Sequence, residues 1–227
     1  MIKLKQIDGN EIEIIPQSDQ AKAHFADANN YAMVVIDEFS HEPFKGYIKP
    51  DSVILDIGAN IGLFALHVMP YVKEIVCVEP TPEHMEIQGN LFWHNWHNIR
   101  NGKFHHEQSA LNSYTGTARF RKEPVNTTMN SLSDRLDSFE VNCITLFDLC
   151  EKYKLDSVDF CKIDIEGSEF KAITIDRVQE VSHIIKAFWL ETHPRNLESM
   201  THFKYIFEQC GYKVELIDFN GTVYATK

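Results

Sequence analysis

Long apolar runs and basic clusters are both missing from this sequence. The sequence contains no stretch of about 18 apolar residues, the length needed to cross a membrane. Residues 1–5 lack the apolar core of a signal peptide. The formal net charge is −11 and no run rich in Lys or Arg occurs. Binding to nucleic acid or to an anionic membrane is therefore not expected, since both need clustered positive charge.

Cysteine is scarce as well. The five cysteines are an odd number and form no Cys-x-x-Cys pair. Cys77 and Cys161 lie in apolar runs, where a free thiol behaves as a small hydrophobic side chain. A reducing, cytoplasmic location is the prediction that follows.

Internal repeats and low-complexity linkers are also absent. With 227 residues, 44% of them hydrophobic, the chain is long enough for one α/β domain with an ample core. We predict a single domain over residues 1–227, in which residues 1–50 form an N-terminal extension and residues 51–227 form the core. The extension should contain a hairpin over 2–15, a helix over 17–29 and a strand over 31–39.

Strands and helices are expected to alternate after residue 51. Principal strands are predicted at 53–57, 74–78, 104–111, 157–165 and 184–190, with a closing hairpin at 212–219 and 222–225. Helices are predicted at 63–71, 82–96, 146–153 and 197–210. Two short strands, at 117–121 and 141–144, flank a polar loop at 123–135 whose length is typical of a lid or binding loop.

The segment after the first principal strand indicates a nucleotide-like ligand. Gly58 and Gly62 mark a sharp turn from strand to helix, which aims backbone N–H groups at one spot. A dinucleotide fingerprint would place a second glycine at position 60, where this chain has Asn60, and Asp56 precedes the turn. The Asn60 side chain leaves less room for a diphosphate, and Asp56 suits a ligand with an ammonium group.

A second acid supports this reading. Glu79 ends the next apolar run, 23 positions after Asp56, where an acid in such a unit accepts hydrogen bonds from ribose hydroxyls. A ribose, an ammonium group and no diphosphate together indicate S-adenosylmethionine.

Polar residues follow each of the five principal strands. Because ligands of open α/β sheets lie beyond the carboxyl ends of the strands, these residues are the candidates for one shared pocket. They are Asp56 with the glycine turn, Glu79, Gln108 with Ser109, Asp164 with Glu166, and Glu191 with His193.

Four segments carry a resemblance to a known family. VILDIGANIGLFAL at 53–66, CVEP at 77–80, CKIDIEGSEF at 161–170 and LETHP at 190–194 resemble the FkbM family of S-adenosylmethionine-dependent methyltransferases. The resemblance runs from about residue 53 to residue 194. It implies a Rossmann-like class I methyltransferase fold, with a seven-stranded, mostly parallel sheet and helices on both faces. It also implies methyl transfer, usually to a hydroxyl oxygen.

The same resemblance implies a cofactor site. Glu79 would take the ribose hydroxyls, while Ser109 and Ala110 would flank the adenine. The methionyl and ribose side would be lined by Asp56, Gly58, Ala59, Asn60 and Gly62. Pro80, Gln108 and Asp164 are assigned to this site as well.

Methylation of a hydroxyl also requires a base. His193 is the first choice, because imidazole titrates nearest neutral pH, and Asp164 and Glu166 are the second choice. The structural alternatives are that His193 pairs with Glu191, and that one of the two other acids caps a helix or forms a salt bridge.

No metal is assigned. His94, His97, His105 and His106 have no carboxylate or cysteine at ligand spacing. A different arrangement stays open, in which Asp164, Glu191 and His193 bind Mg²⁺ or a similar ion to polarise a substrate hydroxyl.

The sequence thus predicts a methyltransferase that acts on an oxygen of a small molecule or glycan. The alternatives are N-methylation at the same cofactor site, an NAD- or nucleotide-sugar-binding Rossmann protein, and a binding module without turnover. The identity of the acceptor and the existence of a homodimer are left open by the sequence.

Overall fold

The computed structural model describes residues 2–5, 11–14, 43–95, 103–121, 131–132, 138–217 and 221–227. The predicted helix over 17–29, the predicted strand over 31–39 and most of the predicted loop over 123–135 lie outside the described residues. The predicted N-terminal hairpin is confirmed, because β1 (Ile2–Lys5) pairs antiparallel with β2 (Glu11–Ile14).

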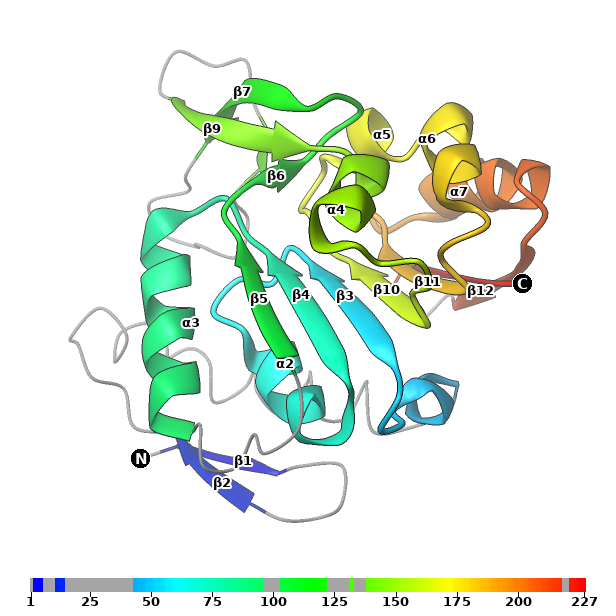
Figure 1. Cartoon of the computed structure of the whole chain (residues 1–227). Coiled ribbons are helices and arrows are strands. Elements are labelled where there is room, and N and C mark those ends of the chain that lie inside the picture. Colours follow the sequence, from blue (N-terminus) through cyan, green and yellow to red (C-terminus); the bar gives the residue numbers. More distant parts are fainter. Residues whose placement is uncertain are drawn as a thin grey trace.

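A seven-stranded sheet forms the centre of the molecule, as Figure 1 shows, and its strand order is β12-β13-β11-β10-β3-β4-β5. The strands are β3 (Val53–Ile57), β4 (Glu74–Val78), β5 (Lys103–Glu107), β10 (Phe160–Ile163), β11 (Ala187–Glu191), β12 (Lys213–Ile217) and β13 (Thr222–Thr226). Strands β5, β4, β3, β10 and β11 run parallel, and β13 is antiparallel to both β11 and β12. The predicted mostly parallel, seven-stranded sheet is confirmed.

Helices cover both faces of this sheet. They are η1 (Phe44–Tyr47), α2 (Leu63–Val68), η2 (Met69–Tyr71), α3 (Pro82–Asn95), α4 (Leu146–Tyr153), α5 (Glu169–Ala172), α6 (Ile175–Val181) and α7 (Leu197–Gln209). Side chains alternate along β3, so Ile54 joins the core beneath α2 and α3, whereas Leu55 and Ile57 join the core beneath α4, α6 and α7. Every residue of β3 and β4 is buried, because helices cover both faces of the sheet at these central strands.

A second sheet was not predicted. It has four strands in the order β6-β9-β7-β8, namely β6 (Ala110–Leu111), β7 (Gly116–Arg121), β8 (Ser131–Leu132) and β9 (Phe139–Ile144). The prediction of one strand over 104–111 was therefore wrong. This segment forms two strands, β5 in the large sheet and β6 in the small one. The Ser109 N–H donates to the Glu107 carbonyl at 3.0 Å, which turns the chain between them.

The large sheet reverses its strand order between β3 and β10. The strand after β3 in the chain, β4, pairs on one side of β3, whereas β10 pairs on the other. Such a switch point leaves a crevice beyond the strand ends. The turn at Gly58 lies in it with φ of +77°, so close to β10 that a Cβ on this residue would lie 1.7 Å from the Asp164 carbonyl oxygen.

Among the described residues, no helix combines the length and the apolar character that crossing a membrane requires.

Gly58→Ala should destabilise the protein strongly. A left-handed backbone costs an alanine about 1–2 kcal/mol, and overpacking against a backbone oxygen adds about 1–3 kcal/mol. We expect a loss of about 2–5 kcal/mol in the free energy of unfolding, measured by urea denaturation. Gly89→Ala is the matched control, because a Cβ there meets no atom within 4 Å and the residue lies in α3. This control should be neutral or stabilising, and equal losses in both variants would contradict the steric argument.

Candidate active site

A pocket with about 550 Å³ of empty space, part of it open to solvent, lies at the carboxyl ends of the parallel strands. The large sheet contributes residues that follow β3, β4 and β10, and the small sheet contributes Ala110, Leu111 and Phe120. The small sheet therefore forms one wall of the cavity.

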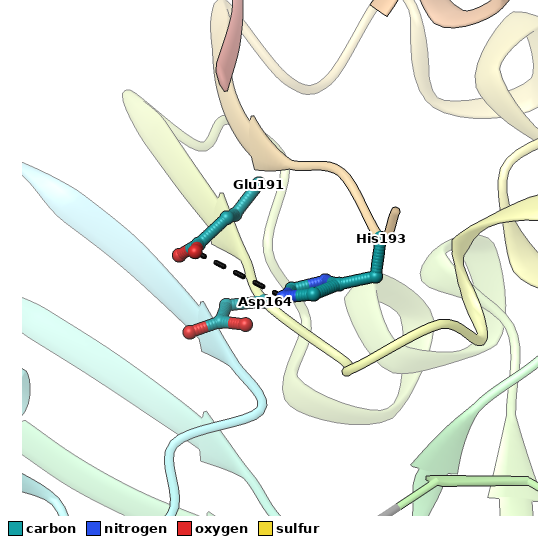
Figure 2. A group of neighbouring side chains, drawn as sticks. All are labelled: Asp164, Glu191 and His193. Carbon is teal, nitrogen blue, oxygen red and sulfur yellow. Dashed lines mark ion pairs between the residues drawn. The ribbon is translucent and has the colours of Figure 1, made fainter. Parts of the chain in front are cut away.

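Three side chains from the ends of β10 and β11 come together at this edge (Figure 2). Asp164, Glu191 and His193 each have an atom capable of binding a metal, and these atoms all lie within 4.8 Å of one another. His193 Nε2 lies 3.9 Å from Glu191 Oε1, and the Arg195 guanidinium donates to the same Glu191 oxygen.

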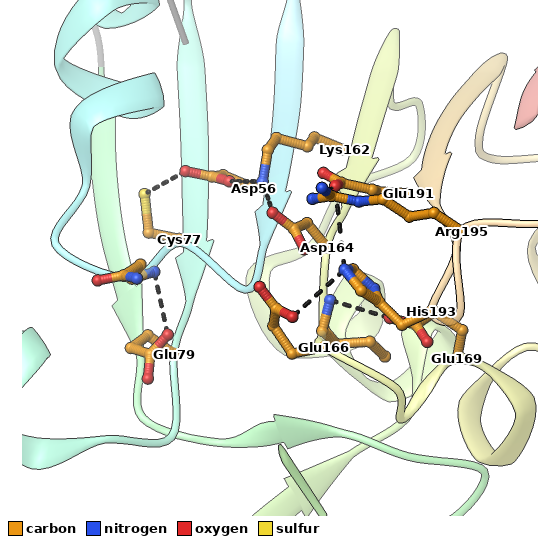
Figure 3. Close-up of polar contacts among 12 residues, drawn as sticks. Asp56, Cys77, Glu79, Lys162, Asp164, Glu166, Glu169, Glu191, His193 and Arg195 are labelled. Carbon is orange, nitrogen blue, oxygen red and sulfur yellow. Dashed lines mark hydrogen bonds and ion pairs between the residues drawn. The ribbon is translucent and has the colours of Figure 1, made fainter. Parts of the chain in front are cut away.

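His193 is held between two further acids (Figure 3). Its Nδ1 lies 3.1 Å from Oε1 of Glu169, a carboxylate that is wholly buried. Its Nε2 lies 3.2 Å from Glu166 Oε2. Burial opposes protonation of His193, but the hydrogen bond to Glu169 and the charges of Glu166, Glu169 and Asp164 outweigh it and raise the histidine pKa.

Glu166 lines the cavity directly. Its backbone, three residues after the end of β10, has φ of +51°, and its side chain belongs to the cavity wall. Burial, together with the charge of Asp164, raises the pKa of Glu166 to about 7, although His193 and Arg195 oppose this shift. A carboxyl group with such a pKa can exchange a proton near neutral pH.

Asp56 lies deeper than the sequence suggested. Its side chain is fully buried, and Lys162 Nζ lies 3.7 Å from Asp56 Oδ1 and 3.6 Å from Asp164 Oδ2 (Figure 3). Burial raises the pKa of Asp56 to about 6 despite the opposing charge of Lys162. Asp56 is thus a buried partner of Lys162 behind the turn.

The turn itself is fixed by Glu79. Asn60 adopts a left-handed backbone, with φ of +49°, and its N–H donates to Glu79 Oε2 at 3.0 Å. The Thr81 N–H donates to Glu79 Oε1 at 2.9 Å, and His84 Nδ1 lies 3.3 Å from the same oxygen. Burial opposes ionisation of Glu79, yet the hydrogen bonds from His84 and Thr81 outweigh it and lower its pKa. The Glu79 carboxylate is therefore a negatively charged acceptor on the cavity wall.

Ser109 and Ala110 line the opposite end of the cavity. The Ser109 hydroxyl donates to Glu107 Oε1 at 2.7 Å, which fixes the chain where it passes from β5 to β6. Gln108 is exposed and lines a separate groove on the small sheet. Phe120 was missed by the sequence analysis, because nothing in the sequence of β7 shows that it folds over this cavity.

Most of the predicted site residues share the cavity. Those that line it are Gly58, Asn60, Glu79, Pro80, Ser109, Ala110, Asp164 and Glu166. Ala59 and Gly62 are buried or strained parts of the turn, with φ of +83° at Gly62. Asp56 and His193 lie behind the wall, in contact with Lys162 and Glu166 respectively.

Comparison with known proteins agrees with this geometry. Residues 56–214 match the profile of a family described as "Methyltransferase FkbM domain". The chain belongs to this family. A sequence search of curated proteins found no match.

Two solved structures share the fold of this FkbM-family chain. The first is methyltransferase FkbM from Methylobacillus flagellatus KT, with a TM-score of 0.56 and 14% identity over 92% of this chain and 55% of that one. The chain thus spans little more than half the length of that protein. The second is a methyltransferase from Geobacter sulfurreducens, with a TM-score of 0.51 and 8% identity over 93% of this chain and 90% of that one. The class I methyltransferase fold predicted from the sequence is confirmed.

Asp56→Asn should remove a pH dependence of stability. The Asp56 pKa of about 6 exceeds the ordinary value of 3.8, so between these values the folded protein holds a proton that the unfolded chain has released. The stability that this bound proton contributes to the folded protein is fully present below pH 3.8, the ordinary pKa, and is lost as the pH rises through 6. Between about pH 4.5 and pH 7.5 it amounts to about 2 kcal/mol.

The free energy of unfolding, measured in urea at these two pH values, should therefore fall less in Asp56→Asn than in the wild type. Asp51→Asn, which changes an exposed carboxyl group just before β3, should behave as the wild type does. The same fall in all three proteins would contradict the burial argument.

Proposed function

We propose that this protein transfers a methyl group from S-adenosylmethionine to a hydroxyl oxygen of a small molecule or glycan. One observation carries the proposal: the turn at Gly58 and Asn60, the ionised Glu79 and the proton-exchanging Glu166 all line one cavity. A cofactor site and a proton acceptor within the same cavity are what this chemistry requires.

The residues of the cavity fit the cofactor. Glu79 keeps hydrogen-bonding capacity beyond its contacts with Asn60, Thr81 and His84, and can accept hydrogen bonds from the ribose hydroxyls. Ser109 and Ala110 would flank the adenine. Asp56 and Asp164 would contribute negative charge to the methionyl side.

When bound, S-adenosylmethionine supplies a methyl group on a positively charged sulfur. The protein's part is to align the acceptor oxygen with that group, and alignment of this kind contributes about 7–11 kcal/mol in favourable cases. Glu166 then accepts the proton of the acceptor hydroxyl at a carboxylate oxygen. His193 Nε2 lies 3.2 Å from Glu166 Oε2, and Glu169 contacts the other ring nitrogen of His193.

The geometry favours Glu166 over His193 as the group that takes the proton directly, because Glu166 lines the cavity. Oxygen is favoured over nitrogen as the acceptor for a related reason. An alcohol needs a base to remove its proton, whereas a neutral amine attacks without one.

Glu79→Gln should weaken cofactor binding. Loss of the charge should cost about 1.5–3 kcal/mol, roughly a tenfold to hundredfold rise in Kd, because Glu79 is a charged hydrogen-bond acceptor. Isothermal titration with S-adenosylhomocysteine measures this change, and NAD should not bind either protein.

Glu74→Gln is the matched control for Glu79→Gln. Glu74 is the first residue of β4, and Glu79 follows the other end of that strand. Glu74 Oε1 lies 2.8 Å from His105 Nε2. Its substitution should leave the affinity for S-adenosylhomocysteine unchanged. Equal affinities in the wild type and Glu79→Gln would refute the assignment of the ribose site.

Glu166→Gln should lower turnover while cofactor affinity stays within about twofold. General base catalysis typically contributes 10²–10⁴-fold, so we expect kcat to fall by roughly that factor. The measurement is the release of S-adenosylhomocysteine over a panel of hydroxylated small molecules and glycans, followed by kinetics with the best acceptor. Full activity of Glu166→Gln with that acceptor would exclude Glu166 as the base.

A further inference from the structure

In the group formed by Asp164, Glu191 and His193, the Nε2 atom of His193 is buried and faces carboxylate oxygens. His193 Nε2 is inaccessible to solvent and has no hydrogen-bond partner among the described residues. Its near neighbours are Glu166 Oε2 at 3.2 Å and Glu191 Oε1 at 3.9 Å, both of them carboxylate oxygens.

The orientation of His193 is set by Glu169. This carboxylate is wholly buried, and its Oε1 accepts backbone N–H groups from Ile165 at 3.3 Å and Gly167 at 3.1 Å, as well as the contact from His193 Nδ1. An oxygen that already receives backbone N–H groups is an acceptor, so the His193 Nδ1 must carry the proton. The lone pair of a neutral His193 then lies on Nε2, which points toward the other acids (Figure 3).

Several carboxylates lie around this nitrogen. They are Asp164, Glu166, Glu169 and Glu191, and Lys162 and Arg195 are basic side chains in contact with them. Glu169 Oε2 and Asp164 Oδ1 are buried, and the described residues provide neither with a hydrogen-bond partner. One oxygen of each of these two carboxylates can therefore accept a further cation.

We propose that Asp164, Glu191 and His193 bind a divalent first-row metal ion, with Glu169 holding His193 in the ligating orientation. Two ligand atoms that each lie about 2.1 Å from an ion are roughly 3–4.2 Å apart, so the observed spread of at most 4.8 Å needs only small side-chain movements. A buried carboxylate on the far nitrogen of a histidine ligand is the usual support for such a site. Arg195, whose side chain is largely exposed, can swing away from Glu191.

The ligand set indicates which ions to expect. Carboxylates suit Mg²⁺ and Mn²⁺, whereas imidazole suits later first-row metals. Two carboxylates with one imidazole therefore favour an ion such as Mn²⁺, which accepts both, over Mg²⁺. If the proposed function holds, such an ion would bind the acceptor hydroxyl, make its proton easier to remove and leave Glu166 to accept that proton.

The test measures Mn²⁺ binding alone. The chain of 227 residues is stripped of metal with EDTA, desalted and titrated with Mn²⁺, and the electron paramagnetic resonance signal of the free ion is recorded. We expect one ion to bind per chain. Asp164→Asn and Glu191→Gln should each weaken binding at least tenfold, and Glu169→Gln should weaken it by 10–100-fold. Glu86→Gln, an exposed carboxylate on α3, should bind as the wild type does.

Two results would overturn the metal site. The first is no binding by the wild type at millimolar Mn²⁺, as expected if a protonated His193 alone balances the acids. The second is binding that Glu191→Gln and Glu169→Gln leave unchanged while circular dichroism shows both variants folded. Because no cofactor or acceptor is present, either failure leaves the proposed methyl transfer intact. Mn²⁺ binding without any affinity for S-adenosylhomocysteine would instead count against the proposed function alone.

Discussion

Lys162 makes it possible for this protein to gather several acids at one edge of its sheet. Its ammonium group lies between Asp56 on β3 and Asp164 just after β10, and it is almost completely buried. Without a cation there, two carboxylates at neighbouring strand ends would repel each other at low dielectric. The pairing is incomplete, since the pKa of Asp56 is still raised to about 6. Two carboxyl groups thus share one cation at this edge of the sheet, an arrangement that suits a cationic cofactor and, as we propose, a metal ion.

Two glutamates of the site differ in their ionisation although they are the same residue type. Glu79 receives hydrogen bonds from Asn60 and Thr81, and its pKa is lowered. Glu166 lies among other acids, and its pKa is raised to about 7. Environment thus favours the ionised form of Glu79 and gives Glu166 a carboxyl group that exchanges protons, which is how acid and base roles are usually divided within one site.

The small sheet completes the cavity and is tied to the large one. Its strands enclose a core of their own, with Phe120 and Val141 among the buried residues. The Leu132 N–H donates to the Ser168 hydroxyl at 3.0 Å, which joins β8 to the segment that follows β10. Because Phe120 and Ser168 both line the cavity, this contact fixes the small sheet over the same pocket that the strand ends of the large sheet form.

The sequence by itself determined the local part of this structure. Buried strands followed by turns depend on short-range patterns, so the segments around Asp56 to Gly62 and Glu79 could be predicted. The methyltransferase fold followed from the resemblance of these and two later segments to the FkbM family. The tertiary structure alone decided which distant residues meet. It divided 104–111 between two sheets, placed Lys162 between two acids, and set Glu169 behind His193. Apolar periodicity shows that a residue is buried, but pairing between strands decides what it is buried against.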